Sequence, residues 1–299
     1  VAPAAVELQA VVGHLAGDLD NTDGRIATNS QNLTLSASAL TNATGQIQHV
    51  GTGTLQLRAG TLAGNGGQMT SNGLLDLTAD NVTLDQSSTT AKQIQIDSTT
   101  LSNENGQILQ TGTDVTQIKA SSKLGNTGGV IASNGNTMLL VGDLFNQDGA
   151  IRATGNASLT VNASGAVDNH ATLPVTDGGI RSGGAATVTA ASLDNSQGLI
   201  SSGDTLSVVT SHDINNSQGL LASSHSLSAT ASTIDNGRGT VASVNGGLAL
   251  SASSGAINNT LGKITAAQML STTNQGIDNT DGLLVANSAS IDTREQILN

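Results

Sequence analysis

The sequence predicts an all-β fold, a parallel β-helix (β-solenoid) of about 13 coils with a period near 20–23 residues. The first observation behind this prediction is a recurring unit. It is clearest as LDNSQGLISSGDTLSVVT from Leu193, INNSQGLLASSHSLSAT from Ile214 and IDNGRGTVASVNGGLALSA from Ile234. An aliphatic residue opens each unit, Asn follows two places later, and Gly follows five places later. Self-similarity at a fixed period of this length is typical of a solenoid, in which each unit forms one coil.

The second observation is the local hydrophobic pattern. Runs such as LTLSAS, LQLRA, LDLTA and LALSA alternate apolar with small polar residues, which is the period of a half-buried strand. Helical spacing is not sustained, and Ser, Thr, Asn and Gly are poor helix formers. Two or three short strands per unit, joined at corners rich in Gly and Asn, give a parallel β-helix.

The third observation is the composition. The chain of 299 residues has no Trp, Tyr or Cys, and Phe145 is its only aromatic residue. A large globular core without aromatic side chains is hard to fill to native density, whereas a narrow core of stacked aliphatic residues needs none. A repeat array also grows by adding coils, so this length does not require a second domain.

Thirteen units can be placed in order along the chain. Their opening residues are Leu19, Leu40, Leu62, Val82, Leu101, Leu124, Leu144, Val167, Leu193, Ile214, Ile234, Ile257 and Ile277. Residues 19–299 are therefore predicted to form a β-helical shaft. Residues 1–18 are interpreted as a partial preceding coil and residues 297–299 as the start of a further one, so we expect the array to continue beyond both ends.

Two units depart from the pattern. The unit from Val82 lacks both the Asn and the Gly and continues into the alternating run KQIQID. The unit from Val167 inserts the segment 170–178 before the pattern resumes. Surface loops absorb insertions at little cost, because closure entropy rises slowly with length. We take the apolar residues of this insertion loop, Leu173, Pro174 and Val175, as a candidate interaction loop. The alternative, a length variation folded over the coil, stays open.

Stacking turns sequence positions into columns, because equivalent residues on adjacent coils lie about 4.8 Å apart. We predict that the Asn column is a structural ladder whose amides hydrogen-bond along the axis, with a polar binding stripe as the alternative. Its clearest members are Asn195, Asn216, Asn236, Asn259 and Asn279. The Gly column, present in eleven of the thirteen units, predicts a corner that needs a positive φ or a close backbone approach.

The position after the opening aliphatic residue carries charge. Over the last five units it reads Asp194, Asn215, Asp235, Asn258 and Asp278. Carboxylates on adjacent coils would repel by roughly 1 kcal/mol even in water, and alternation with Asn doubles their separation. We interpret this column as charge spacing along a fibre and not as a reaction centre.

Charge and composition disfavour several function classes. A formal net charge of −12 offers no basic stripe for phosphates, and there are no aromatic platforms for bases, so no nucleic-acid partner is expected. No apolar run approaches the roughly 18 residues of a membrane helix, so we expect no membrane insertion by this segment. The lack of Cys fits export through an oxidising compartment.

No cofactor and no metal centre are predicted. DNTDG occurs at 20–24 and at 278–282 and resembles the start of a calcium loop, but no acidic residues follow at the later ligand positions. A plain turn capped by Asp is therefore favoured. The five histidines fall at different offsets within the repeat, so they do not stack into a ligand set for zinc.

No catalytic residues are predicted. Ser211-His212-Asp213 contains the residue types of a catalytic triad, but neighbours on a strand point to opposite faces. A polysaccharide-active β-helix enzyme is the remote alternative. Its chemistry needs clustered carboxylates on adjacent coils, which the alternating Asp column avoids.

The pattern L-[DN]-N-x-x-G-x-[IL]-x-S…L-x-[LV] resembles the haemagglutinin repeats of filamentous haemagglutinin-type exoproteins. The units from Leu19, Leu144, Leu193, Ile214 and Ile277 fit it best. The resemblance implies a right-handed β-helix. It also implies that this helix is the non-catalytic, rod-like shaft of a large bacterial exoprotein, secreted or held on the outer cell surface.

The same resemblance implies partners and a function. The expected partners are an outer-membrane two-partner secretion transporter, engaged through regions outside this chain, and the surface of host or neighbouring bacterial cells. Adhesion to host cells or biofilm is the leading function. The alternative is the stalk of a contact-dependent growth-inhibition toxin delivery protein. The chain contains neither an N-P-N-G-type secretion motif nor a toxin-like domain that would decide between them.

Overall fold

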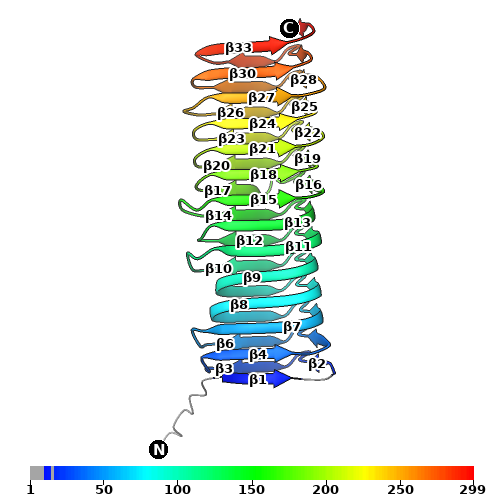
Figure 1. Cartoon of the computed structure of the whole chain (residues 1–299), viewed down its shortest axis with the longest axis vertical. Helices are drawn as coiled ribbons and strands as arrows, with labels where there is room; N and C mark the ends of the chain where they lie inside the picture. Colours follow the sequence, from blue (N-terminus) through cyan, green and yellow to red (C-terminus); the bar gives the residue numbers. More distant parts are fainter. Residues whose placement is uncertain (1–9, 15–16) are drawn as a thin grey trace, which may run out of the picture.

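The computed structural model describes residues 10–14 and 17–299 of the chain. Within these residues the regular secondary structure is entirely β, with 34 strands joined in one parallel sheet. The strands stack as a β-solenoid of about 14 turns with a period near 21 residues, which confirms the predicted fold. Strand β1 (Ala10–His14) forms one side of a coil before the first predicted unit. In Figure 1 the front strands run from left to right and the chain returns behind them as it climbs, so the coil is right-handed.

The described residues contain no helix with the length and apolar character that crossing a membrane requires. Strand β1 pairs in register with β4 (Asn32–Ser36), beginning with Ala10 opposite Asn32. Of the predicted preceding coil, residues 1–9 and 15–16 lie outside the described part of the chain.

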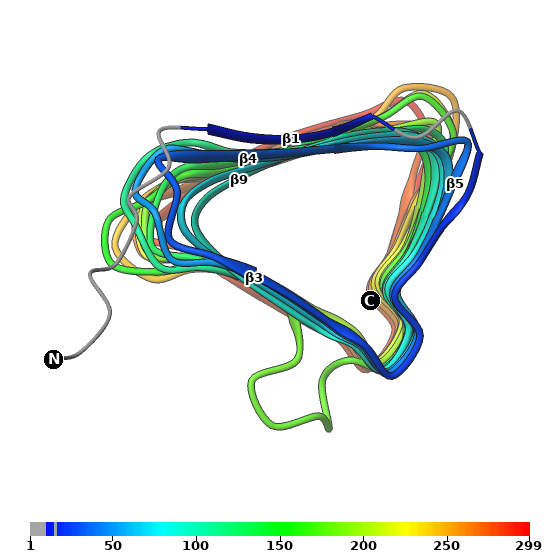
Figure 2. The ribbon, with the colours of Figure 1, turned by 90° about the horizontal axis from the view of Figure 1, so that it is seen from below.

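Each coil has three sides, which give the solenoid a triangular outline in cross-section (Figure 2). Side A consists of β1, β4, β15 (Leu159–Ala163), β18 (Ala186–Ala190), β21 (Leu206–Thr210), β24 (Leu227–Ala231), β27 (Leu248–Ala252), β30 (Met269–Asn274) and β33 (Ser288–Thr293). Side B consists of β2 (Leu19–Asp20), β5 (Ala39–Thr41), β16 (Ala166–Asp168), β19 (Ser192–Asp194), β22 (Ile214–Asn215), β25 (Ile234–Asp235), β28 (Ile257–Asn258), β31 (Ile277–Asp278) and β34 (Ile297–Leu298).

Side C consists of β3 (Arg25–Thr28), β6 (Gln46–His49), β10 (Gln107–Gln110), β12 (Val130–Ser133), β14 (Ala150–Ala153), β17 (Gly179–Ser182), β20 (Leu199–Ser202), β23 (Leu220–Ser223), β26 (Thr240–Ser243), β29 (Lys263–Ala266) and β32 (Leu283–Val285). Five longer strands bend around one or two corners and contribute to more than one side. They are β7 (Thr54–Ala63), β8 (Gln68–Thr83), β9 (Ser88–Ser102), β11 (Thr116–Gly125) and β13 (Thr137–Phe145).

The opening aliphatic residues form one unbroken column along side B. Each pairs with its equivalent on the next coil, from Leu19 with Leu40 to Ile277 with Ile297. Together with the inward residues of sides A and C they form a core of Leu, Ile, Val and Ala with one Met. Phe145 stays outside this core, where Lys123 of the preceding coil lies 4.7 Å from its ring centroid. A cross-section this narrow is filled without aromatic side chains.

The Asn column forms a hydrogen-bonded ladder where side B turns into side C. From Asn103 to Asn299, the Nδ2 of each Asn donates to the Oδ1 of the Asn on the next coil over 2.6–2.7 Å. Each amide also satisfies corner carbonyls; Asn195, for example, donates to those of Gly198 and Leu220. The members singled out from the sequence, from Asn195 to Asn279, are all buried. The ladder therefore pairs backbone groups that would otherwise be buried unsatisfied.

The ladder is interrupted where Gly64 and Leu84 occupy the Asn position. Below the break, Asn21 donates to Asn42 over 2.6 Å. Above it, the Oδ1 of Asn103 is buried without a hydrogen-bond partner, because Leu84 on the coil below has no donor to offer.

The Gly column is explained by a close approach and not by a positive φ. A Cβ on Gly219 would lie 2.1 Å from the carbonyl oxygen of Asn195 and 2.7 Å from the Oδ1 of Asn216, so the ladder fills the space that a side chain needs. The positive φ falls one residue earlier, as at Gln218 with 57°. The same is true of the fourth position in all thirteen units, and only Gly66 and Gly128 are glycines there. Assigning a positive φ to the Gly column is therefore wrong.

The alternating Asp and Asn column is hydrogen-bonded as well as spaced. The Oδ1 of Asp194 accepts from the amide of Ser196 over 2.9 Å and from the Nδ2 of Asn215 over 3.1 Å. Asp235 is held in the same way by the Nδ2 of Asn258, over 2.9 Å. Each intervening Asn thus separates two charges and also donates to one of them.

We expect opposite effects from substitutions at two neighbouring corner positions. Gly219→Val places a side chain against the Asn195 carbonyl and should lower the free energy of unfolding by about 3 kcal/mol. Gln218→Gly removes the backbone strain of a non-glycine residue in the left-handed conformation and loses only an exposed side chain, so it should be neutral or stabilising. Denaturant midpoints of the two variants check this. A Gly219→Val variant as stable as the wild type would contradict the assigned close approach.

We expect the ladder to be sensitive to the loss of one donor. Asn216→Ala removes the Oδ1 that accepts from the Nδ2 of Asn195 and the Nδ2 that donates to the Oδ1 of Asn236, at a cost of about 2–3 kcal/mol. Asn216→Asp has the same shape but sets an acceptor against the Asn236 acceptor, so it should destabilise at least as much. Asn162→Ala, on the exposed face of side A, is the control and should have little effect. Equal denaturant midpoints for Asn216→Ala and Asn162→Ala would refute a structural ladder.

Candidate functional site

The insertion loop, residues 170–178, follows Asn169 in the chain, and its outer part stands outside the triangular outline in Figure 2. Its base is fixed by Thr172, which is fully buried. The Oγ1 of Thr172 donates to the Asn169 carbonyl over 3.1 Å and accepts from the amide of Leu199 over 3.0 Å. The amides of Ala171 and Leu173 donate to carbonyls of the next coil. The start of the insertion is therefore part of the corner, and only its tip is free to protrude.

The return end of the insertion is held by charge. Asp177 lies 3.2 Å from Arg152 and 3.7 Å from Arg181, two residues that pair in register on β14 and β17. The Nε of Arg181 also donates to the carbonyl of Gly178 over 2.9 Å. One carboxylate thus lies between two guanidinium groups that would repel each other without it.

The tip of the insertion presents the residues taken from the sequence as a candidate interaction loop. Leu173 and Pro174 are exposed and Val175 is half-buried. Two backbone bonds shape the tip: the amide of Val175 donates to the Thr172 carbonyl over 3.3 Å, and that of Gly178 donates to the Val175 carbonyl over 2.9 Å. The tip is therefore a compact double turn and not an open strand.

A cluster of Asp168, His170 and Asp194 lies at the first corner of the insertion. Strands β16 and β19 pair so that Asp168 lies opposite Asp194 on the next coil. The Oδ1 of Asp168 lies 2.6 Å from the Nδ1 of His170 and accepts from the His170 amide over 3.2 Å. One potential ligand atom from each of the three side chains lies within 4.8 Å of the other two.

Sequence reasoning missed this cluster. The expectation that no histidine belongs to a converging ligand set fails at His170, because its partners are two carboxylates and not other histidines. The alternation of Asp and Asn in the Asp column holds only over the last five units, which begin at Asp194. The preceding unit carries Asp168 in the same column, so two consecutive carboxylates could have been recognised from the repeat alone.

The cluster is strongly acidic around its one imidazole. The hydrogen bond with Asp168 raises the pKa of His170 above its ordinary value of 6.5, partial desolvation opposes this effect, and the nearby charges of Asp168, Asp194 and Asp148 add to it. Protonated His170 therefore compensates part of the negative charge at this corner.

The two DNTDG segments form capped turns. The Oδ1 of Asp20 accepts from the amide and the hydroxyl of Thr22, over 2.9 and 2.6 Å, and Asp278 is bonded in the same way to Thr280. These hydrogen bonds lower the pKa of both carboxyls. Asp23 takes the left-handed corner conformation, as does Asp281 in the other segment.

Ser211, His212 and Asp213 lie in an exposed bend and not on a strand, so the argument from opposite strand faces does not apply to them. The Oγ of Ser211 lies 3.2 Å from the Nδ1 of His212. The same Nδ1 is also 3.1 Å from the Ala191 carbonyl, and Asp213 accepts instead from the hydroxyl of Thr233 over 2.8 Å. The Asp therefore does not orient the imidazole, as a triad requires.

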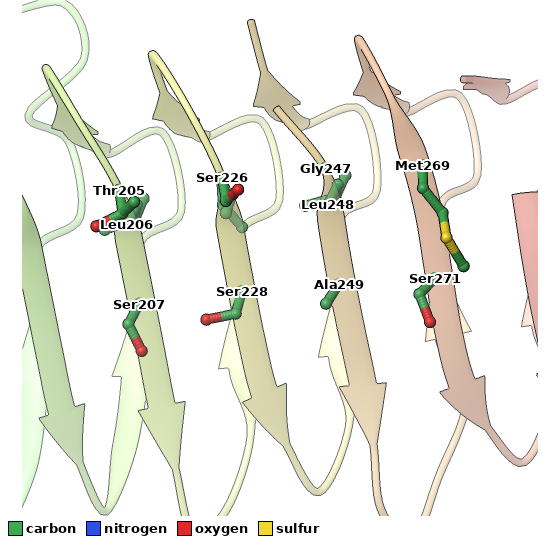
Figure 3. Close-up of a pocket in the computed structure, with 11 residues that line it drawn as sticks. Thr205, Leu206, Ser207, Ser226, Ser228, Gly247, Leu248, Ala249, Met269 and Ser271 are labelled. Carbon is green, nitrogen blue, oxygen red and sulfur yellow. The ribbon is translucent and has the colours of Figure 1, made fainter. Parts of the chain in front are cut away.

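A shallow groove of about 510 Å³ crosses β21, β24, β27 and β30 on the outer face of side A (Figure 3). Ser207, Ser228, Ala249 and Ser271 lie along it on successive strands, and Met269 lies beside them with 47% of its surface exposed. Small uncharged side chains on a flat sheet offer few groups that could orient a ligand. We therefore assign no ligand to this groove.

The stacked coils, the Asn ladder and the single insertion define the chain as a β-solenoid repeat protein. Its sequence matches the Haemagglutinin repeat family in five overlapping stretches, at residues 4–79, 50–128, 109–171, 162–218 and 208–256. The chain belongs to this family, which confirms the resemblance found in the repeated unit. No curated protein and no solved structure matches the chain.

The raised pKa of His170 predicts how the corner depends on pH. A pKa above 6.5 in the folded chain means that the His170–Asp168 pair stabilises the fold fully below pH 6.5 and less as the pH rises through the raised pKa. The effect is expected to stay below about 1 kcal/mol because the imidazole is partly exposed. NMR titration of the His170 ring in the presence of chelator should give a pKa above 6.5, and Asp168→Asn should lower it. A pKa unaffected by Asp168→Asn would contradict the assigned cause.

Proposed function

We propose that the chain is part of the non-catalytic, rod-like shaft of a large secreted or cell-surface exoprotein that mediates adhesion to host cells or biofilm. Haemagglutinin repeats on a β-helical shaft fit a rod-like protein of the adhesin type. The observation that carries the proposal is the unbroken register of the opening aliphatic column through every unit. About 14 coils at about 4.8 Å each make a straight rod of roughly 65 Å.

The roles of the polar side chains support a structural function. The repeated Asn side chains bond one another and the corner backbone, and the Asp column is capped by local amides. On such a surface the insertion loop is a segment that protrudes from one side of the triangular outline, as Figure 2 shows. Contact with a cell surface through this loop is therefore part of the proposal.

Secretion is supported by the way the coils are built. Strands pair only with the adjacent coils, between 20 and 29 residues away along the chain in the pairs that enclose the insertion and its neighbours. A solenoid of this kind can therefore fold coil by coil as it emerges from a pore. The outer-membrane transporter of a two-partner pathway is the proposed route, engaged through regions outside this chain. The proposed location is the outer cell surface or the medium.

We expect the tip of the insertion to matter for attachment. The triple substitution Leu173→Ser, Pro174→Ser and Val175→Ser removes the apolar tip but keeps Thr172 and Asp177, which hold the loop. Binding of the purified chain to host cells and to biofilm matrix should fall at least tenfold, because apolar anchors supply much of the affinity of small interfaces. The melting temperature should change by less than about 3 °C, since these residues pack little against the core.

The matched control is Val209→Ser with Met269→Ser, which removes two exposed apolar side chains from side A. This variant should attach like the wild type. Full attachment of the tip variant would show that the loop is not the contact and would leave this segment as a spacer, as the stalk of a toxin-delivery protein requires. No attachment by the wild-type chain would reject the adhesive role altogether.

A further inference from the structure

We propose that Asp168, His170 and Asp194 form a binding site for one divalent metal ion of the zinc class at the base of the insertion loop. Two carboxylates and one imidazole converge there, with a potential ligand atom of each within 4.8 Å of the others. Three protein ligands with room for water are a common arrangement for zinc. The proposed metal site does not depend on the proposed adhesive function.

The backbone holds the two carboxylates in place. Strand pairing of β16 with β19 sets Asp168 opposite Asp194, and the ladder bond from Asn169 to Asn195, at 2.7 Å, locks the same two coils together one residue later. His170 follows directly, so its imidazole is carried to the same side of the corner. The ligands therefore come from two adjacent coils fixed by main-chain hydrogen bonds.

Neighbouring side chains orient the carboxylates. The Nε2 of Gln147 donates to the Oδ2 of Asp168 over 2.5 Å. The Nδ2 of Asn215 and the amide of Ser196 donate to the Oδ1 of Asp194, over 3.1 and 2.9 Å. Each carboxylate thus has a donor from the surrounding structure, as the ligands of metal sites generally do.

The charge at this corner favours a cation. Asp168 and Asp194 are the only carboxylates that occupy consecutive coils in their column, and Asp148 lies near enough to act on His170. The arginines at the other end of the loop lie against Asp177. Among the described residues, no Lys or Arg forms an ion pair with Asp148, Asp168 or Asp194. Two carboxylates therefore converge on a single imidazole, and the charge of Asp148 adds to theirs.

The ligand set indicates which metals to expect. An imidazole nitrogen suits zinc, copper or nickel, whereas calcium and magnesium prefer sites made of oxygen alone. We therefore expect zinc to bind more tightly than calcium. Binding would link the coil of β16 to that of β19 and fix the residue at which the insertion starts.

The test uses the full untagged chain, freed of metal with a chelator and titrated with zinc chloride by calorimetry at pH 7.5. We expect one zinc ion per chain and a higher melting temperature when zinc is bound. NMR should show the His170 ring signals shifting with zinc, and not those of His225. His170→Gln and Asp194→Asn should each weaken binding at least tenfold. Asp194→Asn is suited to this test because Asn already occupies this column at Asn215.

The matched control is His225→Gln. His225 pairs with Asp204 over 3.2 Å and has no third ligand among the described residues, so this variant should bind zinc like the wild type. Absence of saturable binding at 1:1 stoichiometry would overturn the proposal. So would wild-type affinity in His170→Gln and Asp194→Asn, or an equal loss of affinity in His225→Gln.

Discussion

The Asn ladder is the interaction on which the corner of every regular coil depends. Its amides fill the space inside the corner, so a residue five places into the unit has no room for a Cβ, as the 2.1 Å approach at Gly219 shows. The residue before it takes a left-handed conformation that brings the chain round, and Gln86 does so as well in the unit that lacks the Asn. The coil at Leu84 shows that the Gly position accepts a larger residue when the Asn is missing. Without the Asn, Ser87 takes the Gly position, and its hydroxyl donates to the Leu84 carbonyl over 2.7 Å.

The same ladder explains why the insertion does not disturb the rod. The bond from Asn169 to Asn195 spans 26 residues and has the same 2.7 Å length as its neighbours. The extra residues leave the corner only after the ladder position has been filled and the left-handed residue, Ala171, has been reached. Length variation at this point therefore costs loop entropy but no ladder bond or core contact. Insertions elsewhere in the unit would shift a strand and turn its core residues outward.

The repeat allowed the fold to be predicted almost completely. The period, the strand alternation and the opening aliphatic column can each be recognised from residue types that recur at fixed positions of the unit. The thirteen starting residues accordingly pair in register from the first coil to the last. The candidate cluster depends instead on residues 24 and 26 apart across an insertion, where no repeated unit draws attention to them. The left-handed position was missed because its residue type varies, from Asp and Gln to Arg and Leu. Its conformation is imposed by the closed coil and not by local preference.

Stacking also governs how the chain tolerates charge. A column brings each residue within about 4.8 Å of its equivalents, so any charge that recurs in a solenoid faces itself unless the sequence prevents it. Asn215 and Asn258 prevent it in the last five units and turn the neighbouring Asp into a hydrogen-bond acceptor. Asp168 and Asp194 are not separated in this way, and His170 enters the chain at that coil. The break in the alternation and the insertion therefore belong to one local arrangement, in which the loop supplies the group that the carboxylates require.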